Sequence, residues 1–315
     1  MIDAAGAAGL LRKHSNILVI THRRTDGDTC GSSAALCLAL RKLGKNAFIL
    51  HNSETSYRNR VLMEAFLPPE GFEHDFVVTV DVADVGLLSK EAQEFQDKVD
   101  LCIDHHASNG TYAKTLYLEE KAAAAGELIV KVCDELGVEL NKEIADMIYI
   151  AIATDTGCFK YSNTTAQTMR TAARCYDAGA DTISVNKKYF DTKSIKRIKL
   201  ENEIYSGMKF FSERKVALAF ITKKMITEIG ATSDDMDGVS SLAIQIEGVK
   251  LAITLTENKT GGYRMSVRTI GDVDASAFCA NFGGGGHKNA SGAYFKEDDA
   301  EEIIKRVIEV SKEFV

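Results

Sequence analysis

Residues 1–180 alternate short runs of β-branched and apolar residues with longer stretches of helical periodicity. This alternation is typical of a largely parallel sheet flanked by helices, because each parallel strand needs a long crossover to return to the same edge. Strands are predicted at residues 16–21, 46–50, 76–80 and 100–103. Helices are predicted at residues 31–43, 122–136 and 143–153, with Gly44 at a C-cap position. The pattern therefore predicts an α/β fold.

A charged amphipathic stretch at residues 194–211 predicts a helix that connects this region to a second one. After it, strands are predicted at residues 216–221, 249–256 and 263–269, and helices at residues 274–280 and 298–314. We therefore expect an N-terminal domain at 1–190, a helical linker at 191–213 and a smaller α/β domain at 214–315. A length of 315 residues is sufficient for two domains that each bury a core.

The overall charge excludes one class of function. With 38 basic and 45 acidic side chains the net charge is -7, which is the wrong sign for binding long duplex nucleic acid through counterion release. Seven cysteines without a C-x-x-C pair predict neither a disulfide framework nor a zinc knuckle. The sequence has no apolar run of signal-peptide or membrane-spanning length, so we expect a cytoplasmic protein without a membrane partner.

Acidic and histidine side chains follow several of the predicted elements. The candidates are His22, Asp26 and Asp28 after the first strand, Asp81 after the third, Asp104, His105 and His106 after the fourth, and Asp155 after a helix. Any one of them alone is more often a helix cap or a turn residue. Open α/β sheets gather such groups at the carboxyl ends of their strands, where the carboxylates would repel each other without cations between them. Mixed oxygen and nitrogen ligands of this kind suit two divalent ions, Mn²⁺ or Mg²⁺.

The second domain contains a glycine run followed by cationic residues. Gly283 to Gly286 precede His287 and Lys288, and such a run can expose backbone N–H groups to an anion. A flexible surface loop explains the glycines equally well. Arg264 and Arg268 lie four residues apart in a predicted strand and therefore on one face. The pattern predicts a local phosphate-binding site.

The motifs described above, in their order along the chain, resemble those of the DHH phosphoesterase superfamily. They are H-x-x-x-D-x-D from His22, then Asp81, then D-H-H from Asp104, then Asp155 and finally G-G-G-G-H. The last motif is similar to its DHHA1 branch, and the two-domain layout to the bacterial nanoRNase group. This resemblance covers nearly the whole chain. It implies a metal-dependent hydrolase that cleaves oligoribonucleotides of about two to five nucleotides and dephosphorylates 3′-phosphoadenosine-5′-phosphate (pAp).

The resemblance also implies roles for individual residues. One metal is held by His22, Asp26 and Asp81, and the other by Asp28, Asp81, His105 and Asp155, so that Asp81 bridges the two ions. His106 faces the substrate phosphate and Asp104 orients the histidines. The residues expected to bind substrate are Arg268, Gly284, Gly285, Gly286, His287 and Ser291. Mn²⁺ is expected to serve better than Mg²⁺ because imidazoles favour the softer ion.

Two departures from the family pattern concern Thr25, where a proline is usual, and Lys288-Asn289, where an arginine is common. Other hydrolases remain open: a phosphodiesterase for linear or cyclic dinucleotides (pApA, cyclic-di-AMP), a RecJ-like exonuclease or a family II pyrophosphatase. A catalytically inactive nucleotide-binding regulator is the alternative from another class. The sequence leaves open the preferred oligonucleotide, the end attacked and whether the chain forms a homodimer.

Overall fold

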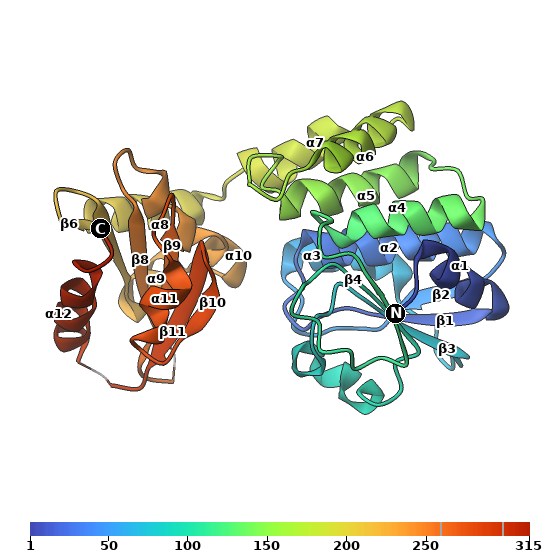
Figure 1. Ribbon diagram of the computed structural model, residues 1–315, viewed down its shortest axis with the longest axis horizontal. Helices are drawn as coiled ribbons and strands as arrows, with labels where there is room; N and C mark the ends of the chain where they lie inside the picture. Colours follow the sequence, from blue (N-terminus) through green and yellow to red (C-terminus); the bar gives the residue numbers. More distant parts are fainter. Residues whose placement is uncertain (259, 298) are drawn as a thin grey trace. The chain divides into compact units, whose positions relative to one another are not determined.

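The computed structural model describes residues 1–258, 260–297 and 299–315. They divide into two compact units, Met1–Thr192 and Lys193–Val315. The first unit contains a five-stranded parallel sheet in the order β2-β1-β3-β4-β5 (Figure 1). Its strands are β1 (Asn16–Ile20), β2 (Asn46–Ile49), β3 (Phe76–Val80), β4 (Leu101–Asp104) and β5 (Thr115–Leu118). The predicted parallel sheet is confirmed, with β5 as an addition.

Helices cover one face of this sheet, and short 3-10 turns cover the other. The first face packs against α1 (Ala4–Lys13), α2 (Gly27–Lys42), α4 (Ala125–Leu136) and α5 (Lys142–Asp155) (Figure 1). The second face packs against η2 (Val85–Leu87) and η3 (Lys90–Phe95). The remaining elements are α3 (Tyr57–Met63), η1 (Glu64–Phe66), α6 (Ala166–Asp177), α7 (Thr182–Asn186) and the π-helical turn η4 (Lys187–Asp191). All seven cysteines are free thiols.

Two helix boundaries differ from the prediction, and both differences affect the site. Helix α2 begins four residues earlier than predicted because Asp26 caps it, accepting a hydrogen bond from the Thr29 amide. It ends at Lys42, with Leu43 as the C-cap residue and Gly44, which has a positive φ of 75°, directly after it. Helix α5 continues two residues further than predicted, so Asp155 is its last residue and does not follow it.

The second unit contains a six-stranded mixed sheet in the order β10-β11-β9-β8-β7-β6. Its strands are β6 (Lys209–Phe211), β7 (Val216–Ile221), β8 (Leu251–Glu257), β9 (Tyr263–Thr269), β10 (Gly285–His287) and β11 (Ala290–Phe295). Only β7 and β8 pair in parallel among these described strands. The helices are α8 (Ile195–Ser206), α9 (Lys223–Ile229), α10 (Ser233–Met236), α11 (Ala275–Ala280) and α12 (Ala300–Ser311), with 3-10 turns η5 (Val239–Ser241) and η6 (Ala243–Gln245). A smaller α/β unit is confirmed.

Three predicted segments of this unit take a different form. The stretch predicted as a connecting helix ends at Ser206 and continues into β6, and α8 buries Leu200 and Ile204 in a core with Ala219 of β7. The glycine-rich segment is a β-hairpin, β10-β11, and not a loop. Helix α12 is capped by Asp299, while the predicted start at Asp298 lies outside the described residues.

Candidate metal centre

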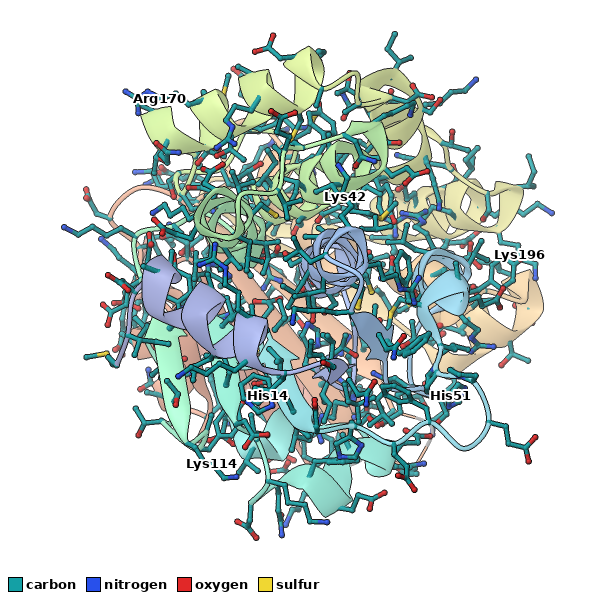
Figure 2. All side chains as sticks on the ribbon, turned by 90° about the vertical axis from the view of Figure 1, so that its right-hand side faces the viewer. His14, Lys42, His51, Lys114, Arg170 and Lys196 are labelled. Atoms are coloured by element: carbon teal, nitrogen blue, oxygen red, sulfur yellow. The ribbon has the colours of Figure 1, made fainter. Side chains whose placement is uncertain are left out.

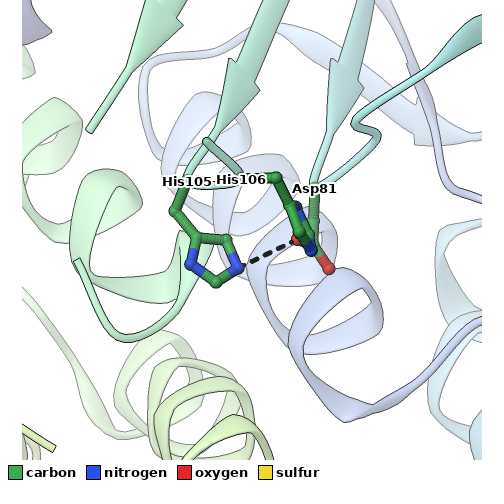
Figure 3. Close-up of side chains that lie close together, drawn as sticks. All are labelled: Asp81, His105 and His106. Carbon is green, nitrogen blue, oxygen red and sulfur yellow. Dashed lines mark ion pairs between the residues drawn. The ribbon is translucent and has the colours of Figure 1, made fainter. Parts of the chain in front are cut away.

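Three adjacent parallel strands bring their carboxyl ends together in the first unit. β3 lies between β1 and β4, so the residues that follow β3 lie between those that follow β1 and those that follow β4. His22 follows β1, Asp81 follows β3, and His105 and His106 follow β4. Figure 3 shows the side chains of Asp81, His105 and His106 directed into one region. The topology therefore produces the convergence that the sequence predicts.

Two further carboxylates reach this region because α2 packs very closely on α5. A Cβ atom at Gly31 would lie 2.4 Å from the Met147 carbonyl oxygen, and one at Gly27 would lie 2.4 Å from the Thr154 side chain. Glycine at both positions lets the helix axes approach. As a result Asp28, in the first turn of α2, and Asp155, at the end of α5, belong to the same cluster.

One group of possible ligands is formed by His22, Asp26 and Asp81. The His22 Nε2 atom lies 3.7 Å from Asp26 Oδ2 and 3.8 Å from Asp81 Oδ2. Asp26 uses its other oxygen, Oδ1, to cap α2. Each side chain therefore keeps a nitrogen or oxygen atom directed at a common point.

A second group is formed by Asp28, His105 and Asp155. The His105 Nε2 atom lies 3.6 Å from Asp28 Oδ2, 3.8 Å from Asp155 Oδ2 and 3.4 Å from Asp81 Oδ1. The ring is oriented by its other nitrogen, Nδ1, which lies 3.1 Å from the Ala122 carbonyl oxygen. Asp81 thus lies beside both groups. In addition, Asp81, His105 and His106 form a third group, which the sequence did not predict as a ligand set.

The charge balance of the cluster calls for a cation. Asp81 is buried, has a positive φ of 61°, and its Oδ1 atom accepts no hydrogen bond within the described chain. Burial and the neighbouring carboxylates of Asp28 and Asp26 raise its pKa well above the ordinary value. Burial and the Asp28 charge also raise the pKa of Asp155, to about 7. A strained, buried carboxylate among other carboxylates, with an oxygen that accepts no hydrogen bond, fits one or more divalent ions.

The Asp28 carboxylate faces the cluster and is also fixed by hydrogen bonds to neighbouring backbone and side-chain groups. It is fully buried, and its carboxylate accepts hydrogen bonds from the amides of Ala125 (2.7 Å) and Gly126 (3.1 Å) at the start of α4 and from the Ser32 hydroxyl (2.7 Å). Burial nevertheless raises its pKa, although the nearby His105 opposes the shift. A helix N-terminus favours a negative charge, so α4 fixes this carboxylate in place.

In the second unit, strand pairing groups only some of the predicted substrate residues. Ala290 of β11 pairs with Arg268 on one side and His287 on the other, so these side chains share a face. Ser291 is buried on the opposite face, where its hydroxyl donates to the His287 carbonyl oxygen at 2.9 Å. The structure therefore does not group the Ser291 side chain with Arg268 and His287.

The glycines of the hairpin have a steric role that the sequence did not reveal. A Cβ atom at Gly284 would lie 2.2 Å from the Gly292 carbonyl oxygen, and one at Gly286 would lie 2.8 Å from the Ser291 hydroxyl oxygen. A Cβ atom at Gly285 would meet open space. Gly284 and Gly286 thus permit close strand pairing.

The remaining described histidines lie outside the three groups. The His14 ring stacks on Phe76 with centroids 4.2 Å apart, and the His74 ring meets Phe95 edge-on. His51 is exposed beyond the end of β2; Figure 2 labels it and His14.

Two family models match this chain: "DHH family, N-terminal domain" over residues 16–152 and "DHHA1 domain" over residues 214–313. The chain belongs to the DHH/DHHA1 family. It is 29% identical to the "Bifunctional oligoribonuclease and PAP phosphatase NrnA" of Thermus thermophilus over 303 residues, which covers 94% of this chain and 89% of that protein. The protein of the same name from Bacillus subtilis is 26% identical over 306 residues, covering 95% of this chain and 96% of the relative.

Solved structures share the fold of this DHH/DHHA1 chain. An exopolyphosphatase-related protein from Bacteroides fragilis matches with a TM-score of 0.87 at 22% identity, covering 98% of this chain and 96% of that one. RecJ from Thermus thermophilus, in complex with Mn²⁺, matches with a TM-score of 0.59 at 16% identity, covering 99% of this chain and 55% of RecJ. At these identities the likeness concerns the fold. Within the described residues, no helix combines the length and apolar character that crossing a membrane requires.

Asn109 is a site residue that the sequence analysis missed. Its Nδ2 atom donates to Asp104 Oδ2 at 2.7 Å, while Asp104 Oδ1 accepts from the His105 amide and lies 2.8 Å from His106 Nδ1. Burial alone would raise the Asp104 pKa, but hydrogen bonds from His106 and Asn109 outweigh it and the pKa is lowered. The hydrogen bond to Asp104 likewise raises the His106 pKa. The only sequence signal was an Asn in the turn after D-H-H.

Two more asparagines hold the backbone of the segment from His22 to Asp26. Asn52 Nδ2 donates to the His22 carbonyl oxygen and Asn59 Nδ2 to that of Thr25, each at 2.9 Å. Thr25 occupies the position where a proline is usual in the family, so the Asn59 contact restrains a segment that lacks the stiffness of a proline ring. Neither asparagine lies near this segment in sequence, so the sequence carried no signal for them.

Proposed function

We propose that this protein is a metal-dependent phosphoester hydrolase that cleaves short oligoribonucleotides to mononucleotides and dephosphorylates pAp. The curated relatives named above carry both activities in their names and match along nearly the whole chain. The observation that carries the proposal is the convergence of His22, Asp26, Asp28, Asp81, His105 and Asp155 at one sheet edge.

The proposed ligands divide into two sets with Asp81 between them. His22 and Asp26 belong to the first set, and Asp28, His105 and Asp155 belong to the second. When bound, two divalent cations would neutralise charge that develops on the phosphoryl oxygens during hydrolysis. We expect Mn²⁺ to support higher activity than Mg²⁺, because each set includes an imidazole.

His106 is the proposed catalytic group beside these ligands. Its Nδ1 atom is engaged by Asp104 and its side chain is 38% exposed. Nε2 is therefore the nitrogen left for a substrate phosphate oxygen, and a proton held there can pass to the departing oxygen. Asp104 and Asn109 fix the ring orientation, so they act as positioning residues.

In the second unit we propose that Arg268 and His287 hold the nucleotide, with the exposed backbone around Gly285 beside them. Charge-assisted hydrogen bonds from a guanidinium and an imidazole are suited to phosphate oxygens. Gly284, Gly286 and Ser291 contribute through the shape of the hairpin. The cytoplasmic location stays a prediction, and a homodimer, which the sequence leaves open, is not part of the proposal.

The test is an assay of the purified protein with added Mn²⁺ on pAp, a labelled RNA dimer, a labelled RNA 24-mer, the linear dinucleotide pApA and pyrophosphate. We expect hydrolysis of the RNA dimer and pAp, slow turnover of the 24-mer and no turnover of pyrophosphate. Exhaustive chelation should abolish the activity, and Mn²⁺ should restore it.

An Asp81→Ala protein, purified in parallel, serves as the control for contaminating nucleases. Activity that persists in this variant, or after chelation, would contradict the proposal. Rapid cleavage of pApA without pAp turnover would favour the dinucleotide phosphodiesterase instead.

A further inference from the structure

One face of the second sheet is open along β9, β11 and β10. Along β9 the side chains of Tyr263, Met265 and Val267 are buried, whereas Arg264 is exposed and Arg268 is half-buried. The buried set packs in a core with residues of α11 and α12. The alternate residues therefore point to the other face.

The covering of this other face is incomplete. Over β7 and β8 it is closed, because Ala217 and Ala252 pack against Ala243 of η6. Over β9, β11 and β10 it is lined by small or polar residues and stays accessible, as the exposure of Gly285 and His287 demonstrates. The result is a flat shelf at the sheet edge, which we call the β9–β11 shelf.

Two rows of side chains cross this shelf. Arg268 and His287 flank Ala290 in one row, which is the row already proposed to hold a nucleotide. In the other row Arg264 lies directly opposite Tyr294. The two arginines are four residues apart, or about 14 Å along the strand.

Tyr294 is exposed in a fixed position. The side chain is 51% exposed, yet its hydroxyl donates to the Gly261 carbonyl oxygen at 3.0 Å. The Arg264 guanidinium forms no ion pair or hydrogen bond with a side chain or carbonyl group of the described residues. A tethered aromatic ring beside a cation provides a stacking surface for a base and a partner for a phosphate.

We propose that Arg264 and Tyr294 form a second nucleotide subsite, which takes the next nucleotide of a single-stranded RNA held at Arg268 and His287. This assignment rests on the proposed function. The Arg264 guanidinium binds a backbone phosphate and the Tyr294 ring stacks on a base. A ligand held at Arg268 and His287 reaches this row only by continuing along β9, which an oligonucleotide does and pAp, with one nucleoside, does not.

The test compares ligands of two lengths in the full-length protein. For Tyr294→Ala we expect KM for a labelled RNA pentamer to rise about tenfold, with kcat unchanged and KM for pAp within about twofold. Tyr294→Phe keeps the ring but loses its hydrogen bond to Gly261, so the pentamer KM should rise less than in Tyr294→Ala. Arg264→Gln should raise the pentamer KM and reduce its dependence on salt. Tyr205→Ala, at an exposed tyrosine of α8, is the matched control.

A binding measurement separates this subsite from the proposed activity. Fluorescence anisotropy with the labelled pentamer in the presence of chelator needs no hydrolysis, and pAp serves as the competitor. A wild-type protein that binds the pentamer more tightly than pAp, with that preference lost in Tyr294→Ala, supports the subsite even if neither compound is hydrolysed. Equal losses for pAp and pentamer, an unchanged pentamer affinity, or a wild type without length preference would overturn it.

Discussion

The two units build their polar sites in opposite ways. In the first unit the candidate ligands lie at the end of a parallel sheet, and Asp28, Asp81 and Asp104 are buried. In the second unit Arg264, Tyr294 and His287 stand on the open half of a mixed sheet. The first arrangement needs positioned hydrogen bonds and a cation to offset desolvation, whereas the second keeps its groups hydrated until a ligand arrives.

Because of this difference, the chemical step can be assigned to the first unit and substrate specificity to the second. A buried cluster with fixed partners for Asp28, Asp104 and His105 is preorganised, which suits charge stabilisation during a reaction. An exposed shelf of a few cations and one ring suits recognition, because its contacts form only with the ligand. We therefore expect changes in the first unit to remove activity and changes in the second to alter substrate preference.

The largest expected effect comes from Asp81→Ala. This change removes the carboxylate that lies beside both ligand sets, so activity should fall to the level seen without added cation. Calorimetry should show a greater loss of Mn²⁺ binding than in His22→Ala or Asp155→Ala, which each remove a ligand from one set only. If Asp81→Ala binds two Mn²⁺ ions as tightly as the wild type, Asp81 is not shared between them.

A smaller and more selective effect is expected from His287→Ala. Hydrolysis of short RNA and pAp should fall by about tenfold to a thousandfold, the effect of losing one or two charge-assisted hydrogen bonds. Metal content, measured by elemental analysis, should not change.

The ester bis-p-nitrophenyl phosphate tests this separation directly, because it offers the shelf little to bind. We expect His287→Ala to hydrolyse it almost as well as the wild type. The exposed His51 provides a control, and His51→Ala should leave every rate unchanged. An equal loss of activity on the ester and on RNA would place His287 in the chemical step. It would contradict the separation of chemistry in the first unit from substrate binding in the second.

The convergence of the first unit's side chains was predictable from the sequence for a physical reason. Parallel strands have one common carboxyl edge, so residues such as Asp81 and His105 converge wherever their strands pair. The asparagines could not be predicted in the same way. Asn52 and Asn59 reach the segment containing His22 through tertiary contacts, and an isolated asparagine has no periodicity that would reveal this.

In the second unit the sequence predicted which strand face carries the arginines, but it did not predict the strand structure of the glycine run. The pairing of Arg264 and Arg268 on one face followed from the two-residue period of a strand, and the structure agrees. The glycine run was expected to be an anion-binding loop because glycine has no side-chain pattern to show pairing. Its strand form depends on the tight contact of Gly284 with the backbone at Gly292. That contact exists only once β10 and β11 are paired.

The smallest predicted effect concerns stability, and it probes the buried character of the first unit. The pKa of Asp155 is raised from 3.8 to about 7 in the folded chain without metal. Between these pH values the unfolded chain releases a proton that the folded chain retains, so metal-free stability should fall as pH rises through this range. A cation requires the deprotonated carboxylates and should therefore bind more tightly at higher pH.

We accordingly expect added Mn²⁺ to raise the melting temperature by a few degrees at pH 8 and by less at pH 5, as measured by thermal denaturation. Asp155→Asn removes the titrating group next to Asp28 and should make the metal-free stability less dependent on pH. Variants of the exposed His287 should keep the full dependence, because the effect arises from burial in the first unit. A melting temperature that rises equally at both pH values would mean that the cation does not compete with protons for these carboxylates. The contrast between a buried, charge-compensated site and an open shelf would then lose its electrostatic basis.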